Sequence, residues 1–350
     1  MEKLLKHNLP RLDFRFGNFV EVFYAVLIPF SLGWAFFTFL RRKYKKNEKA
    51  FRSELPVISI GNIHSGGSGK TPLVQAIAEH YKNKSPAIVS RGYKASLSSR
   101  GAKVNIQGAF AVGDEPWMLH KLFGLSVWIG KDRIKSIQKI ESSRASKMVI
   151  LDDGFQHFKV NRDLDLVLID TNRSEDENFC LPLGDLREPL SSLTEASAVI
   201  LTGNDEARFQ IWNSKLKENF DNLPVFEAHL KIDGLYYGDT LYSDFRMKKL
   251  LGFSGIAGNQ RFQKTLSCLP QAQYFRGFKD HHAYTQDDVT QLIAHGKELE
   301  VEGYVTTDKD WIKVDRYFSE CDEVVLSLRI GYELSDDFWR FTDSKMEKKC

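Results

Sequence analysis

The sequence predicts an α/β protein with a mostly parallel sheet and helices on both faces. Two observations lead to this fold class: short apolar runs alternate with stretches of helical periodicity, and polar clusters follow the apolar runs. The runs expected to form the main sheet are 57–60, 87–89, 126–129, 148–151, 166–169 and 199–201. Further strands are expected at 225–230, 235–237 and 303–305, which predicts a second, smaller α/β domain. We therefore expect an N-terminal membrane-associated segment at 1–49, a core domain at 50–225 and a smaller domain at 226–350. Whether the last strand and helix of the chain pack on the core domain or on the smaller domain stays open.

The composition is that of a folded globular protein. Of the 350 residues, 42% are hydrophobic and 27% are charged, and the length is sufficient for two domains. The formal net charge of +3 is too small to indicate a nucleic-acid partner. The four cysteines, at 180, 268, 321 and 350, are too widely spaced for a zinc pattern or a disulfide framework, which indicates a reduced, cytosol-facing catalytic region.

The most informative stretch is 57–72, where an apolar run leads into a glycine-rich turn and then a helical pattern. An ordinary glycine turn is the alternative, but Gly69-Lys70-Thr71 in this context is typical of a phosphate-binding loop. Glycines let backbone amides converge on phosphate oxygens, Lys70 reaches the β- and γ-phosphates, and Thr71 ligates Mg²⁺. The strict motif fails at its first glycine, where His64 stands. We predict a P-loop NTPase-like core that binds ATP through His64, Ser65, Gly66, Gly67, Ser68, Gly69, Lys70 and Thr71.

The segment 22–40 contains no charged residue and is about long enough to cross a bilayer. The basic cluster at 41–46 follows it directly, which places the rest of the chain in the cytoplasm by the positive-inside tendency. We therefore predict an N-terminal membrane helix. A second interpretation stays open, an amphipathic segment lying in the interface, because Pro29, Ser31 and Gly33 weaken a straight span.

Polar clusters follow successive strands of the predicted core, and ligands gather at the carboxyl ends of strands in parallel sheets. These clusters lie at 90–93, 112–116, 130–133 and 151–157. Either Asp152 or Asp153 is expected to hold Mg²⁺. Each cluster alone also has an ordinary explanation, such as a helix cap at Asp114 or a surface cation at Arg133, but their joint appearance favours a site.

Two later segments are further candidates. The loop at 180–189 carries Arg187 and Glu188, and it is interpreted either as a lid on the phosphate side or as a surface loop with a local ion pair. The segment 278–284 carries His281 and His282. Adjacent residues of an extended chain point to opposite sides, so one orienting or catalytic histidine is favoured over a metal pair, and which of the two it is stays open.

Taken in order, these motifs resemble one family. They are Gly66-Gly67-Ser68-Gly69-Lys70-Thr71-Pro72, Ser90-Arg91-Gly92-Tyr93, Gly113-Asp114-Glu115-Pro116, residues 152–157, residues 184–189, residues 280–284 and residues 306–310. The chain resembles the tetraacyldisaccharide 4'-kinases, which phosphorylate a precursor of lipid A, over nearly its whole length. The resemblance implies an ATP- and Mg²⁺-dependent kinase with nucleotide bound between two domains, and an acylated glucosamine disaccharide 1-phosphate as acceptor.

The resemblance also implies roles for individual residues. Asp114 is expected to be the general base and His281 to orient it, while Lys70 and Arg133 neutralise the transferred phosphate. The residues expected at or near the metal are Thr71, Glu115, Asp152, Asp153 and Glu188. The residues expected to contact the substrate are Tyr93, Gln156, His157 and Arg187.

The family also implies a location on the cytoplasmic face of the inner membrane of a Gram-negative bacterium. The expected partners are the lipid substrate and the membrane, with no nucleic acid and no obligate protein partner. Two rival hypotheses stay open: a membrane-bound P-loop ATPase that acts as a regulatory switch without a lipid acceptor, and a kinase for a soluble metabolite. Both rivals send the γ-phosphate to water or to a soluble product.

Overall fold

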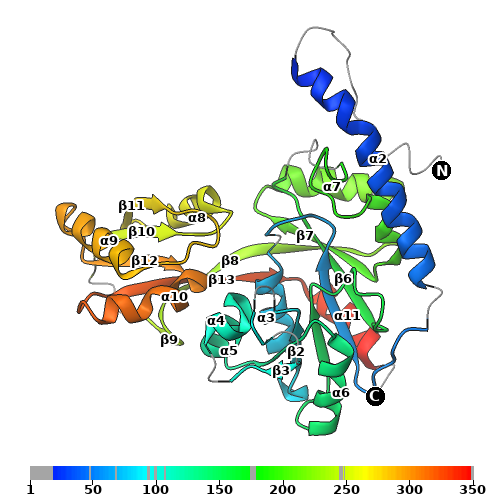
Figure 1. Ribbon diagram of the computed structural model, residues 1–350, viewed down its shortest axis with the longest axis horizontal. Helices are drawn as coiled ribbons and strands as arrows, with labels where there is room; N and C mark the ends of the chain where they lie inside the picture. Colours follow the sequence, from blue (N-terminus) through cyan, green and yellow to red (C-terminus); the bar gives the residue numbers. More distant parts are fainter. Residues whose placement is uncertain are drawn as a thin grey trace. The chain divides into compact units, whose positions relative to one another are not determined.

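The computed structural model describes residues 19–46, 49–67, 69–92, 95–97, 101–105, 108–173, 179–243, 247 and 249–347 (Figure 1). The chain forms two compact units. Unit 1 comprises Met1–Ser90, Asp132–Leu230 and Tyr332–Cys350, and unit 2 comprises Arg91–Lys131 and Lys231–Gly331. Two of the four chain boundaries between the units fall within strands, β8 (Val225–Tyr237) and β13 (Val325–Leu334), and the other two follow Ser90 and Lys131.

Unit 1 contains the parallel sheet that the sequence predicts. Its strands run in the order β8, β7 (Ala198–Gly203), β6 (Leu164–Asp170), β1 (Val57–Asn62), β5 (Val149–Asp152) and β2 (Ala87–Ser90), and neighbours are parallel throughout. Every residue of β1, β5 and β6 is buried, so alternate side chains on both faces are covered. The strand β1, which leads into the phosphate loop, lies in the middle of this sheet.

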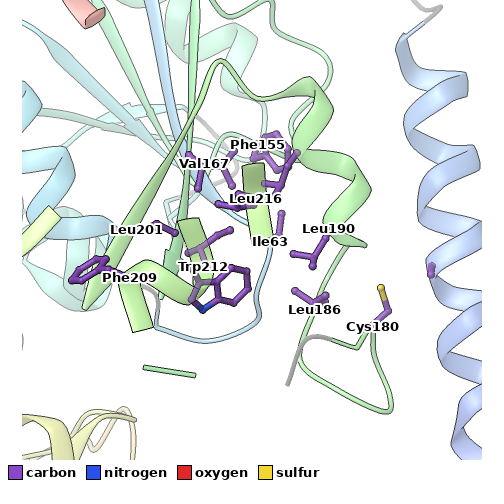
Figure 2. Close-up of a cluster of buried hydrophobic side chains, with 14 residues drawn as sticks. Ile63, Phe155, Val167, Cys180, Leu186, Leu190, Leu201, Phe209, Trp212 and Leu216 are labelled. Carbon is purple, nitrogen blue, oxygen red and sulfur yellow. The ribbon is translucent and has the colours of Figure 1, made fainter. Parts of the chain in front are cut away.

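Helices and 3-10 helices follow these strands along the chain, and a last helix follows β13. They are α3 (Lys70–His80), η1 (Lys82–Lys84), α6 (Arg133–Ser143), η3 (Leu190–Glu195), α7 (Glu206–Asn219) and α11 (Asp336–Glu347). One hydrophobic cluster joins α7 to the sheet. There Phe209, Trp212 and Leu216 of the helix pack with Val167 and Leu201 of the strands (Figure 2). The apolar periodicity of α7 therefore fixes this helix against the sheet.

Unit 2 has its own parallel strands, in the order β11 (Ala272–Gly277), β10 (Leu250–Ser254), β12 (Gly303–Thr307) and β13. Its helices from the C-terminal half are α8 (Asn259–Leu266), α9 (Gln286–Glu298) and α10 (Asp308–Ser319). A capping box begins α9, with Thr285 and Asp288 bonded to each other's backbone N–H groups. The short strand β9 (Thr240–Leu241) pairs antiparallel with the end of β8.

The segment 91–131 belongs to unit 2, whereas the predicted core domain was the continuous range 50–225. This segment forms β3 (Ala102–Lys103), α4 (Ala109–Val112), α5 (Asp114–Phe123) and β4 (Ser126–Ile129). The physical reason is the apolar face of α5, because Met118 and Leu122 are buried in one hydrophobic cluster with Phe253 and Trp311. Contacts that distant in sequence leave no local signal in the chain.

The N-terminal apolar segment forms the helix α2 (Phe19–Lys46). Among the residues described, no helix combines the length and the apolar character needed to cross a bilayer, so the predicted membrane-spanning helix is not supported. Instead, α2 packs along unit 1 through a stripe at helical spacing: Ser31, Ala35, Thr38 and Arg42. The Oγ of Ser31 donates a 2.6 Å hydrogen bond to the carbonyl of Cys180.

The outward side of α2 is apolar. Its large exposed hydrophobic side chains are Val26, Phe30, Trp34, Phe36, Phe37, Phe39, Leu40 and Tyr44. Phe30 is 65% exposed and Phe37 is 56% exposed, although side chains of this type are usually buried. So many exposed apolar side chains on one helix are unusual for a protein surface.

Candidate active site

The phosphate loop has the predicted strand, loop and helix context. β1 ends at Asn62 and α3 begins at Lys70. Gly66 and Gly69 have positive φ angles of 82° and 71°, and a Cβ on Gly69 would collide with the hydroxyl of Tyr332. The loop geometry therefore requires glycine at Gly69.

His64 replaces the first glycine of the usual motif, and the structure explains why this is tolerated. Its backbone forms an antiparallel bridge with Leu186, and its φ angle is not positive, so no glycine is needed there. Arg173, which the sequence analysis did not identify, donates to the carbonyls of Ser65 (3.1 Å) and Gly67 (3.3 Å). Ser68 lies outside the described residues.

Three cations surround Asp153, at the end of β5. The Nζ of Lys70 lies 3.2 Å from its Oδ1, the Nη1 of Arg187 lies 3.2 Å from its Oδ2, and the Nη1 of Arg133 donates to its carbonyl at 2.9 Å. Burial alone would raise the pKa of the Asp153 carboxyl, but Lys70, Arg187 and Arg133 outweigh it and hold that pKa below its usual value. An excess of positive charge is thus gathered beside the phosphate loop.

Asp152 precedes this cluster and is differently placed. Its side chain is buried, and its Oδ2 accepts a 3.0 Å hydrogen bond from the hydroxyl of Ser90. Within the described part of the chain, no three acidic, histidine or cysteine side chains converge as a metal site would require. Mg²⁺ beside nucleotide phosphates needs only one or two carboxylates, and the oxygens of Asp152 and Thr71 suit it chemically.

The expected substrate residues Gln156 and His157 follow the same strand. The Nε2 of Gln156 donates to the carbonyl of Asn62 at 2.8 Å. Burial, assisted by the positive charges of Arg133 and Arg162, lowers the pKa of His157 to about 4. His157 is therefore neutral at pH 7, and its buried Nε2 has no hydrogen-bond partner among the described residues. Tyr93, another of the four expected substrate residues, lies outside the described residues.

Unit 2 holds a second charged cluster, at the first turn of α5. The Nζ of Lys313 lies 3.2 Å from Oδ2 of Asp114, and the Nζ of Lys309 lies 3.3 Å from Oε1 of Glu115. Burial alone would lower the pKa of Lys309, but Glu115, with help from Asp114 and Asp280, raises it. Lys309 therefore remains charged at neutral pH.

The predicted pair between Asp114 and His281 is not formed. The His281 side chain is exposed, its φ angle is +56°, and it has no side-chain hydrogen bond or ion pair within the described ranges. Its turn is set by backbone bonds, since the N–H of His281 donates to the carbonyl of Gly255. Lys313 occupies the place beside Asp114 that was expected for the histidine, and His282 instead contacts Asp288 at 3.1 Å.

The loop at 180–188 is held between the phosphate loop and α2. On one side, the N–H of Ser65 donates to the carbonyl of Asp185 and the N–H of Arg187 donates to that of Ile63. On the other side, the indole of Trp34 donates to the carbonyl of Arg187 at 3.0 Å. The loop therefore lies beside the phosphate loop, which favours the interpretation as a lid over that of a surface loop with a local ion pair.

Glu188 lies at the end of this loop and was expected near the metal. Its Oε2 pairs with the guanidinium of Arg42, and both side chains are buried. We therefore assign Glu188 to anchoring the loop on α2. In the sequence, the basic cluster at 41–46 indicates only membrane topology, and nothing nearby distinguishes Arg42 from its exposed neighbours.

Replacing Arg42 with methionine is expected to lower the free energy of unfolding by about 3–5 kcal/mol, because the buried Glu188 would lose its cationic partner. Urea denaturation of the wild type and the variant measures the difference. Lys43→Met is the control, since Lys43 is exposed on the same helix. The double variant Arg42→Met/Glu188→Leu is expected to recover most of the loss, and equal stabilities of wild type and single variant would contradict the buried pair.

Comparison with known proteins shows the family to which this chain belongs. A family model described as tetraacyldisaccharide-1-P 4'-kinase matches residues 23–347. The chain belongs to this kinase family. A tetraacyldisaccharide 4'-kinase of Desulfotalea psychrophila is 33% identical over 350 residues, covering 92% of this chain and 97% of the relative. A tetraacyldisaccharide 4'-kinase of Francisella tularensis subsp. novicida is 34% identical, covering 71% of this chain and 79% of the relative.

A solved structure of the tetraacyldisaccharide 4'-kinase family has the same fold. The crystal structure of LpxK from Aquifex aeolicus in complex with ATP matches with a TM-score of 0.77 and 29% identity, covering 93% of this chain and 99% of that one. The match confirms the mostly parallel α/β architecture that the sequence predicts. The ATP of that complex is bound to the Aquifex protein.

Proposed function

We propose that this chain is an ATP-dependent kinase that phosphorylates the 4'-hydroxyl of a tetraacylated glucosamine disaccharide 1-phosphate. The observation that carries the proposal is the phosphate loop at the head of α3, with Lys70 beside the cationic cluster around Asp153, in a chain of the tetraacyldisaccharide-1-P 4'-kinase family. Phosphate transfer depends mainly on positioning and on neutralising charge, and these residues supply both.

The residues of unit 1 act on the nucleotide. The loop amides and the positive end of the α3 dipole hold the phosphates, and Lys70 is placed to reach the β- and γ-phosphates. Mg²⁺, when bound, would neutralise charge on the nucleotide phosphates. We assign Asp152 and Thr71 to that ion, because Asp153 is already engaged by Lys70 and Arg187.

The residues of unit 2 act on the acceptor hydroxyl. That hydroxyl loses its proton as it attacks the γ-phosphorus, and Asp114 is the carboxylate assigned to accept it. Its partner Lys313 is also 3.5 Å from Asp310, whose side chain is fully buried, so Asp114 is oriented by a fixed group. On the other unit, neutral His157 and Gln156 are assigned to the sugar hydroxyls, for which uncharged donors and acceptors suffice.

We place the protein on the cytoplasmic face of the inner membrane, with α2 lying in the interface. The support is the outward row of aromatic side chains on α2 and the basic cluster that follows it, which together suit an apolar interior and anionic headgroups. An acylated substrate then meets the enzyme without leaving the lipid phase.

Replacing Phe30 and Phe37 together with serine is expected to weaken binding to lipid vesicles at least about tenfold, because two large apolar side chains no longer enter the interface. Co-sedimentation with vesicles measures the change. Ile211→Ser is the matched control, since Ile211 is also about half exposed in unit 1 but lies on α7. Unchanged vesicle binding of the double variant would show that α2 is not the attachment surface.

One labelling experiment separates this function from its rivals. The wild-type protein is incubated with γ-labelled ATP and the acylated disaccharide 1-phosphate in detergent, and the mixture is extracted with chloroform. Label is expected in the extracted disaccharide. A regulatory ATPase would release the label as inorganic phosphate, and a kinase for a soluble metabolite would leave the label in the aqueous phase.

A further inference from the structure

A basic hollow of about 540 Å³ lies in unit 1, outside the groups assigned above. Its cations are Lys49, Arg52 and Lys159, and Phe51 and Phe158 are among its other lining residues. The N–H of Phe51 donates to the carbonyl of Lys159 at 2.8 Å, so the two segments that form the hollow are fixed to each other. The backbone of the folded unit therefore holds the walls of the hollow in place.

The charge of the hollow is one-sided. No acidic residue lines it, and among the described residues Lys49, Arg52 and Lys159 form no ion pair. Three like charges around one hollow repel each other, and an anion placed between them offsets that repulsion. Lysine and arginine together are the usual partners of a phosphate group, which accepts several charge-assisted hydrogen bonds.

The remaining walls indicate what carries the phosphate. Phe51 and Phe158 are each partly exposed, so aromatic surface faces the hollow beside the cations. An aromatic ring offers apolar contact area, and the C–H face of a sugar ring is a suitable partner for it. Cations next to aromatic rings thus fit a phosphate attached to a sugar better than a free phosphate ion.

The hollow also borders the segments that serve the acceptor. Phe158 and Lys159 directly follow His157, and Ile134, which lines the hollow, directly follows Arg133 of the cluster around Asp153. On the other side, the guanidinium carbon of Arg42 lies 4.8 Å from the centre of the Phe158 ring, so α2 adjoins the hollow. A lipid whose acyl chains lie along α2 would bring its headgroup to this place.

We propose that this hollow binds the phosphate that the acceptor already carries at its 1-position, with the adjoining sugar ring against Phe51 and Phe158. The assignment rests on the proposed function, since the family acts on a disaccharide 1-phosphate. A disaccharide has two ends, and fixing the phosphorylated end in the hollow leaves the other sugar for the phosphate loop. The hollow thereby determines which hydroxyl is phosphorylated.

The test is equilibrium binding in neutral detergent without nucleotide. Two probes are compared, the acylated disaccharide 1-phosphate and the same disaccharide without its phosphate. The wild type is expected to bind the phosphorylated probe at least about tenfold more tightly, the value of one hydrogen bond to a charged group. Arg52→Gln and Lys159→Gln are expected to lose most of this preference, and Arg52→Lys to retain part of it.

The control Lys217→Gln removes a positive charge from the exposed surface of α7 and is expected to keep the full preference. Equal binding of both probes by the wild type, or an undiminished preference in Arg52→Gln and Lys159→Gln, would overturn the proposal. Vesicles with and without phosphatidylglycerol give a separate arm. If the variants lose affinity only for the anionic vesicles, the hollow binds a phospholipid headgroup and the assignment to the acceptor is wrong.

The kinase reaction is measured separately, so the two proposals fail in different ways. A wild type that binds the phosphorylated probe preferentially but transfers no label to it would refute the proposed function and leave the hollow as a phosphosugar site. A wild type that transfers label, with the same preference for the phosphorylated probe in Arg52→Gln and Lys159→Gln, would refute only the role of the hollow.

Discussion

Replacing Lys70 with alanine is expected to lower the rate of phosphate transfer about 10²- to 10³-fold, the usual cost of removing one preorganised charge-stabilising group. Lys70 stands at the first position of α3, directly after the loop, and its Nζ is already oriented by Asp153 and by the side-chain oxygen of Asn62. Single-turnover transfer of label from γ-labelled ATP measures the rate of the chemical step. A variant with wild-type turnover would contradict the assignment of the phosphate loop.

The fold of the Lys70→Ala variant is expected to persist, because Asp153 keeps Arg187 and Arg133 as partners. The pKa of Asp153 is lowered in the wild type, so its contribution to stability is present above its usual pKa of 3.8 and is lost as the pH falls through the lower folded value. At pH 7 the carboxyl is ionised in both proteins, and their denaturation midpoints should be similar. Lys82→Ala is the control for turnover, since Lys82 is an exposed lysine just beyond α3.

The sequence predicted the parts of the site that depend on local structure. The phosphate loop is recognisable because a buried strand, glycines with positive φ and a helix start all fall within residues 57–72. The grouping of Lys70, Arg133 and Asp153 was also predictable, since parallel strands bring their carboxyl ends to one edge of a sheet. The capping box at Thr285 is local in the same way, because its two partners, Thr285 and Asp288, lie within one turn of the chain.

The parts that depend on distant contacts were not predictable in the same way. Lys309 and Glu115 are 194 positions apart, and Arg42 and Glu188 are 146 apart. Each of these ion pairs exists because tertiary packing brings distant segments together, α10 beside α5 in the first pair and the 180–188 loop beside α2 in the second. Packing between distant segments also explains why 91–131 belongs to unit 2. It explains as well why Lys313, and not His281, lies beside Asp114.

The prediction of a membrane-spanning helix is not supported, and packing of distant segments is again the reason. Hydropathy along 22–40 averages over all sides of the helix, whereas the structure separates them. Ser31 and Arg42 bond to Cys180 and Glu188 of the neighbouring loop, and the aromatic side chains are left outward. A helix of this kind has the apolar composition of a membrane segment, but one of its sides is packed against the rest of unit 1.

Replacing Asp114 with asparagine is expected to lower turnover about 10²- to 10⁴-fold, because the amide has nearly the same shape but cannot accept the proton of the acceptor hydroxyl. The affinity for ATP is expected to stay near the wild-type value, since the groups assigned to the nucleotide all belong to unit 1. Initial rates at saturating acceptor, together with equilibrium binding of ATP, separate the two quantities. Lys313 keeps Asp310 as its partner in this variant, so no buried charge is left unpaired.

The matched control is Asp287→Asn, because Asp287 is an exposed carboxylate in the first turn of another helix of unit 2, α9. It removes the same charge from an equivalent helix position and is expected to leave turnover unchanged. If Asp114→Asn weakens ATP binding but leaves turnover at saturating ATP intact, Asp114 serves binding and another group accepts the proton. If both variants are fully active, the acidic turn of α5 takes no part in the chemistry, and the base must be sought elsewhere in the chain.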